Sequence, residues 1–238
     1  MSLIFLRGLD CYTASIINAA VFMGIDYHNL FADLWSETDF TYDQINRLYL
    51  SRRMPRNLAS MGVSMVFINC HSCQERQKAL LALPNGQWLI IGMDAFFIPW
   101  VPFYQTFHHL HYFIAKKESH DLFYCFDPTY DKPDLTLTHE HIVAYTTDAC
   151  IFHKSDVVPF CTDISTDAKR ILENHPQTQQ EIIAQILACA HGNHKNAELL
   201  AKYMTALINN RYLYLHYLEK MLPKQADNCG LLPSLKLY

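Results

Sequence analysis

The alternation of apolar and polar residues along the chain predicts two regions with different structures. Up to about residue 158, short apolar runs and short amphipathic segments alternate with turn residues. Beyond that point apolar residues recur at helical spacing. We therefore expect an α+β domain over residues 1–158 and an α-helical extension over residues 159–238.

A helix is predicted directly after Cys11. Residues 12–23 contain no helix-breaking residue, and Gly24 is well placed to end the helix in the left-handed conformation. Cys11 is therefore expected at a helix N-terminus. The following residues, 27–50, mix aromatic and acidic side chains and predict short helices and loops.

A sheet is predicted for the middle of the chain. Strand-like apolar runs occupy residues 63–69, 87–93, 110–115 and 122–126. A short amphipathic helix over 74–83 and a turn at Pro84-Asn85-Gly86 connect the first two runs. The last two runs flank a polar segment, 116–121, whose length fits an antiparallel hairpin.

Two helices are predicted in the extension, separated by Gly192 and Asn193. Their apolar faces comprise Ile182, Ile183, Ile186 and Leu187 in the first helix, and Leu199, Leu200, Tyr203, Met204, Leu207 and Ile208 in the second. Tyrosines also recur near helical spacing, at positions 203, 212, 214 and 217. Such a series more often marks a packing face or a dimer face than a ligand site, which leaves a homodimer open.

Composition and charge exclude several classes of function. Half of the 238 residues are apolar and 18% are charged, which predicts a folded protein. The net charge of −4 gives no electrostatic footprint for nucleic acid. The densest basic stretch, residues 51–56, holds three arginines and fits either a solvated face or a loop beside an anionic ligand.

The apolar runs are also too short for a membrane span, and the N-terminus reaches Arg7 and Asp10 too soon for a secretory signal. We therefore expect a soluble, cytoplasmic protein that does not bind a membrane. Its eight cysteines are scattered and are expected to be reduced thiols. Cys70 and Cys73 have the spacing of a redox motif, but their position between a strand and a helix favours two ordinary cysteines.

Three residues could together carry nucleophilic chemistry. A helix N-terminus stabilises a thiolate, so Cys11 is a candidate nucleophile, with a structural thiol as the alternative. Asp127 ends the strand that is predicted to pair with the strand containing His111. An acid in that position would orient the imidazole and stabilise its charged form. Cys11, His111 and Asp127 are thus predicted to act as nucleophile, base and orienting acid.

The histidine strand leaves other interpretations open. His109 and His111 share one face of the predicted strand, and His108 points to the other face. A shift of one residue in register would favour His108 over His111 as the partner of Asp127. A metal site and aromatic packing are alternatives for this segment. A closed metal site needs about four ligands, and no other pair of residues has suitable spacing, so we expect no metal and no cofactor.

Two family resemblances follow from these residues. Cys11 opening a helix, with His111 followed sixteen positions later by Asp127-Pro128, resembles the catalytic signature of bacteriocin-processing papain-like cysteine peptidases. The stretch from Gln74 to Trp100, leading into the histidines and then into residues 126–130, resembles the N-terminal domain of the butirosin-biosynthesis acyltransferase family. This second resemblance covers roughly residues 5–150.

The acyltransferase resemblance implies a papain-like fold with a helical C-terminal region. It also implies transfer of an aminoacyl group from a carrier-protein thioester to an amine through an acyl-cysteine intermediate. Carried over by position, Cys11 would be the nucleophile, His111 the general base and Asp127 its orienter. Asp94 also matches a family-like position, where it would either bind a substrate amine or cap a turn.

The chain departs from the related peptidases at two points. Tyr12 stands where they usually carry glycine, and residues 1–10 contain no glutamine to help form an oxyanion hole. The Cys11 backbone N–H could supply one donor, and Arg7 or another group would have to supply the second. We predict Tyr12, Asp94 and His109 as substrate-binding residues.

The leading expectation is an acyltransferase whose partners are an acyl donor, a carrier protein or a small thioester, and a small amine acceptor. With water as the acceptor, the same residues would make a thioesterase, an amidase or a peptidase. A third alternative is a non-catalytic binding protein that retains the papain-like scaffold, which the missing glutamine and Tyr12 favour.

Overall fold

The computed structural model describes residues 2–6, 9–43, 48–68, 72–154, 164–190 and 194–222. Contacts within the chain group it into two compact units. The first unit comprises residues 1–27, 42–48 and 58–159, and the second comprises residues 28–41, 49–57 and 160–238. The second unit thus joins the helical C-terminal region to two segments from the first quarter of the chain. As a division into domains, the boundary between residues 158 and 159 stays a prediction.

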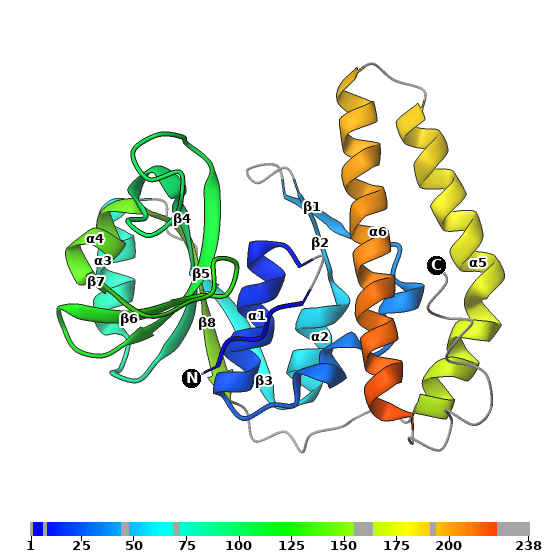
Figure 1. The fold of residues 1–238 in the computed structure, drawn as a ribbon, viewed down its shortest axis with the longest axis horizontal. Helices are drawn as coiled ribbons and strands as arrows, with labels where there is room; N and C mark the ends of the chain where they lie inside the picture. The colour runs from blue at the N-terminus through cyan, green and yellow to red at the C-terminus, as the bar shows by residue number, and fades with distance from the viewer. Residues whose placement is uncertain are drawn as a thin grey trace. The chain divides into compact units, whose positions relative to one another are not determined.

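A six-stranded antiparallel sheet forms the centre of the first unit (Figure 1). The strands follow the order β3-β8-β4-β5-β6-β7. Their bounds are β3 Val63–Ile68, β4 Trp88–Asp94, β5 Leu110–Lys117, β6 Leu122–Asp127, β7 Lys132–Thr138 and β8 Thr146–Lys154. The predicted α+β class, the four predicted strands and the predicted hairpin of β5 and β6 are therefore confirmed.

Helix α1, Cys11–Phe22, packs against β4 and β5. Asp10 caps its N-terminus, since the Asp10 carboxylate accepts hydrogen bonds from the backbone N–H of Thr13 at 2.7 Å and from its hydroxyl at 2.9 Å. Gly24, with a φ of 81°, follows the helix in the predicted left-handed conformation. Residues 12–20 are all buried, so α1 is an internal helix that fixes Cys11 relative to the sheet.

The main core of the first unit joins β4, β5, β6 and β8 to helices α3, Cys73–Ala82, and α4, His139–Tyr145. Its fully buried members include Leu80, Leu89, Ile91, Met93, Phe113, Phe123 and Ile142. A short 3-10 helix, η3 Ala95–Phe97, follows β4. Apolar residues on the strands thus bury themselves against two short helices, which leaves the ends of β5 and β6 as fixed platforms for polar side chains.

Gly92 lies at an irregularity in the pairing of β4 with β8. The Tyr112 hydroxyl donates a hydrogen bond to Asp148 Oδ2 at 2.9 Å beside this glycine. A Cβ atom on residue 92 would lie 2.7 Å from Tyr112 Cε1 and would also meet Asp148 Oδ1. We expect Gly92→Ala to lower the free energy of unfolding by about 1–3 kcal/mol, because overpacking forces these side chains apart. Urea unfolding measures the change, and adding Asp148→Ala should recover part of it; an unchanged midpoint would contradict the prediction.

The second unit contains two long helices, α5 Ile164–Ala190 and α6 His194–Met221, which pack side by side (Figure 1). Both predicted helices are confirmed, and the predicted junction at Gly192-Asn193 lies outside the described residues. Tyr203, Tyr214 and Tyr217 are buried, whereas Tyr212 is exposed. Most of the tyrosine series therefore packs inside this unit.

The segment between α1 and β3 contains short elements. They are η1 Tyr27–Phe31, η2 Leu34–Ser36, β1 Thr41–Asp43, β2 Leu48–Leu50 and α2 Arg53–Ser60. Strands β1 and β2 form a two-stranded sheet, which the prediction of short helices and loops for residues 27–50 missed. No helix in the described part of the chain has the length and apolar content to cross a membrane.

A buried carboxylate joins the early segments to helix α6 of the second unit. Glu37 accepts hydrogen bonds from Ser51 Oγ at 2.7 Å, from the backbone N–H of Arg52 at 2.6 Å, and from Asn210 Nδ2 at 2.6 Å. Two arginines of the basic stretch also pair within the unit, Arg52 with Asp39 and Arg53 with Asp33. The basic stretch is thus partly neutralised by acids of its own chain.

Candidate active site

Cys11 occupies the first position of α1 and is partly exposed. The other cysteines whose side chains the structure describes, Cys125 and Cys150, are buried. Burial raises the pKa of the Cys150 thiol to about 12 and also raises that of Cys125. Among these thiols, Cys11 therefore has the setting of a nucleophile: a helix N-terminus and access to solvent.

His111 and Asp127 form a buried pair at the adjoining ends of β5 and β6. His111 Nε2 lies 2.7 Å from Asp127 Oδ2, and the two side chains are 4% and 0% exposed. The hairpin register pairs Ile114 with Phe126, so Asp127 follows the last pair and reaches back to His111. This register places His111, and not His108, beside Asp127.

Asp127 is held by two further donors. Trp100 Nε1 donates to Asp127 Oδ2 at 2.8 Å, and the backbone N–H of Thr129 donates to Oδ1 at 3.0 Å. Three hydrogen bonds thus fix a carboxylate that has no access to water. Sequence reasoning did not identify Trp100 as a site residue. The only available signal was that a buried indole N–H usually needs an acceptor.

The environment of His111 favours its protonated form. Burial alone would lower the pKa of the imidazole, but hydrogen bonds to Asp127 and to Cys11 outweigh burial and raise it to about 9. Because Asp127 occupies Nε2, Nδ1 is the ring nitrogen left to exchange a proton with Cys11 Sγ. At neutral pH an imidazolium therefore lies against the thiol, the arrangement that stabilises a thiolate.

Tyr130 lies beside this group. Its ring centroid is 5.2 Å from that of His111. Burial raises the pKa of the Tyr130 hydroxyl, and the charges of Asp127 and Cys11 raise it further. A protonated phenol thus lies within electrostatic reach of the thiol. Its role was not predicted, although it belongs to the segment that carries the acyltransferase resemblance.

Tyr12 lies apart from the exposed surface. It is buried, and its ring packs edge-to-face on Tyr112 with the centroids 5.0 Å apart. The helix that presents Cys11 is internal, so the residue after the nucleophile points into the packing between α1 and β5. This position favours a packing role for Tyr12 over the predicted contact with substrate.

Asp94 performs the structural role that was one of its two predicted roles. Its Oδ1 accepts a hydrogen bond from the backbone N–H of Phe96 at 3.0 Å, which caps the turn at η3. Its Oδ2 lies 2.7 Å from Nδ1 of the exposed His108. Binding of a substrate amine by Asp94 stays a prediction.

His109 directly precedes β5, which begins at Leu110, and the strand face predicted to be shared by His109 and His111 stays a prediction. The side chain is half-buried, and Nδ1 is enclosed without a partner among the described residues. Burial lowers the pKa of His109, and the nearby charge of His111 lowers it further. His109 is therefore a neutral side chain at neutral pH, next to the His111–Asp127 pair.

Some predicted features cannot be placed. Arg7, proposed as an oxyanion donor, lies outside the described residues, as do Cys70 and the side chain of Cys73. Among the side chains that are described, no three from His, Cys, Asp and Glu lie close enough to hold a metal ion together.

No protein-family model and no curated protein matches this chain. The interpretation of the site therefore depends on its geometry and chemistry.

Proposed function

We propose that this chain is a cysteine-dependent acyltransferase and that its first unit is a papain-like domain. Cys11 is the nucleophile, His111 the acid and base, and Asp127 the residue that orients His111. The observation that carries the proposal is the 2.7 Å bond between the buried His111 and Asp127, made by an imidazole whose pKa is also raised by the Cys11 thiol at the start of α1. A nucleophile, a base and an orienting acid in this order are the components of covalent acyl transfer.

The reaction has two steps. The Cys11 thiolate attacks the carbonyl carbon of a thioester, a C–S bond to Cys11 forms, the C–S bond to the donor thiol breaks, and His111 gives its proton to the departing thiolate. An amine then attacks the acyl-cysteine and transfers a proton to His111, and Cys11 leaves as a thiolate. The ion pair is thereby restored, and no cofactor is consumed.

The negative charge that develops on the carbonyl oxygen needs two hydrogen-bond donors. The backbone N–H of Cys11 at the helix N-terminus is the first. We assign the second donor to Tyr130, whose ring centroid lies 5.2 Å from that of His111 and whose pKa is raised in part by the charge on Cys11. The phenol would replace the glutamine that the related peptidases use and that residues 1–10 lack.

The donor class and the acceptor class follow from the family resemblance. The donor is a carrier-protein or small thioester, and the acceptor is a small amine. Water in place of the amine would turn the same machinery into a hydrolase. The experiment below separates these outcomes.

The test is intact mass spectrometry after incubation with a panel of acyl thioesters. We expect one acyl adduct on the native chain and none on Cys11→Ala. Added amines should remove the adduct faster than buffer alone; if buffer removes it equally fast, the protein is a hydrolase. No adduct from any donor, together with alkylation of Cys11 no faster than that of a free cysteine, would favour a binding protein.

A further inference from the structure

The loop between β4 and β5 exposes a cluster of aromatic rings. Phe103 is 38% exposed, Tyr104 38% and Phe107 61%. Residues 95–107 contain no Asp, Glu, Lys, Arg or His. Large exposed aromatic side chains gathered on one uncharged segment are typical of a surface that binds an apolar partner.

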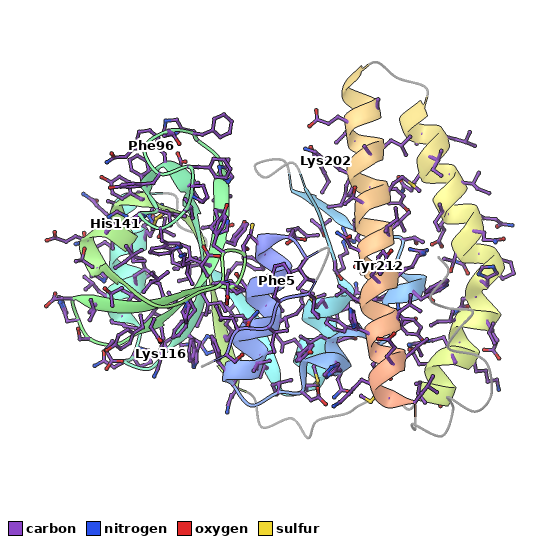
Figure 2. The ribbon with its side chains drawn as sticks, viewed as in Figure 1. Phe5, Phe96, Lys116, His141, Lys202 and Tyr212 are labelled. Atoms are coloured by element: carbon purple, nitrogen blue, oxygen red, sulfur yellow. The ribbon has the colours of Figure 1, made fainter. Side chains whose placement is uncertain are left out.

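This loop is held in place at several points. His141 Nε2 on α4 lies 2.7 Å from the Phe97 carbonyl oxygen, and the Phe97 ring stacks on Tyr145 with the centroids 3.9 Å apart. Figure 2 labels His141 and the neighbouring Phe96 in this part of the first unit. The backbone N–H of Gln105 also donates to the Phe96 carbonyl oxygen at 3.0 Å. The exposed rings therefore lie on a fixed scaffold, which lowers the entropic cost of binding.

The aromatic cluster continues to the candidate active site through His109. The His109 ring centroid lies 4.7 Å from that of Phe103 and 6.1 Å from that of Phe107. His109 precedes His111 by two residues, and the charge of His111 acts on it. Burial and the charge of His111 outweigh the opposing charge of Asp94 and lower the pKa of His109, so an apolar group bound against this ring meets a neutral side chain.

We propose that Phe103, Phe107 and His109 form a binding site for an apolar acyl group carried to Cys11. The inference rests on the proposed function and names its substrate class. The carboxylate next to this segment, Asp94, already pairs with His108 and accepts a hydrogen bond from the backbone N–H of Phe96, so a charged amine would have to compete for it. An uncharged alkyl or aryl chain would instead bury its surface against the two phenylalanines.

The test compares acylation of Cys11 by acetyl, butyryl, hexanoyl and octanoyl N-acetylcysteamine thioesters. For the native chain, kcat/KM should rise by about fourfold for each added methylene group until the site is filled, mainly through KM. Phe107→Ala and Phe103→Ala should flatten this dependence, so that the ratio of kcat/KM for the octanoyl donor to that for the acetyl donor falls. Tyr124→Ala, at an exposed tyrosine on β6, is the matched control and should keep the native dependence.

The outcomes test the binding site and the proposed function separately. Acylation at equal rates for all chain lengths, or equal losses for acetyl and octanoyl donors in Phe107→Ala, overturns the binding site and leaves the proposed function standing. If Phe107→Ala changes only the oligomeric state measured by light scattering, the rings form a contact between copies of the chain and the inference is wrong. If no thioester acylates Cys11, the proposed function fails. In that case, calorimetric titration of Cys11→Ala with the octanoyl thioester tests the binding site independently of catalysis. Binding that is lost when Phe107→Ala is added supports the site, and no binding overturns it.

Discussion

His111→Gln is expected to slow acylation of Cys11 by about 100- to 10,000-fold. Glutamine can still donate to Asp127 from a similar position, so the buried pair stays hydrogen-bonded and the fold is retained. What is lost is the imidazolium that stabilises the Cys11 thiolate and protonates the departing thiolate of the donor. A single-turnover assay with excess enzyme and one thioester measures this step by mass spectrometry.

His108→Gln is the matched control, and we expect it to change the rate by less than about twofold. His108 is exposed and pairs with Asp94, whereas His111 is buried and pairs with Asp127. The sequence alone did not determine which of these two histidines lies beside Asp127, because that depends on the strand register. A loss for His108→Gln as large as that for His111→Gln would show that the register of β5 is not the one described.

The local pattern predicted much of the first unit because each element has a local cause. An uninterrupted run ending at Gly24 predicted α1 and placed Cys11 at its start. The short polar segment between two apolar runs predicted the β5–β6 hairpin, and the contact of Asp127 with His111 follows from the register of that hairpin. The three candidate catalytic residues could be grouped because two of them are neighbours across one hairpin.

Contacts that join distant segments could not be predicted in this way. Trp100 reaches Asp127 only because of the path of the loop that follows η3. Glu37 and Asn210 are 173 residues apart in the sequence but share a hydrogen bond. The local pattern of apolar and polar residues therefore could not predict that residues 28–41 belong to the second unit. Tyr12 was interpreted as a substrate residue because α1 was not known to be buried on nearly all sides.

Asp127→Asn is expected to reduce acylation by about 100- to 10,000-fold and to move its alkaline limit to lower pH. In the native chain, bonds to Asp127 and Cys11 raise the pKa of His111 to about 9, so acylation should persist up to about that pH. Asparagine carries no charge, so less opposes the effect of burial in the variant, and the pKa of His111 falls. Rates measured from pH 6 to pH 10 should show the shift, and an unchanged alkaline limit would indicate that Asp127 does not govern His111.

The same substitution should change the pH dependence of stability. A histidine whose pKa is raised in the folded state binds a proton that the unfolded chain, with a histidine pKa of about 6.5, has already lost. The stabilisation from His111 is therefore fully present below about pH 6.5 and is lost as the pH rises through about 9. We expect the free energy of unfolding of the native chain to fall across this window and that of Asp127→Asn to fall less.

Urea titrations at pH 6.5 and pH 9.5 measure this difference in the free energy of unfolding. His108→Gln is the control and should keep the difference found for the native chain. If the free energy of unfolding falls equally between the two pH values for the native chain and for Asp127→Asn, the buried pair does not hold the extra proton. That result would contradict the ion pair proposed for catalysis.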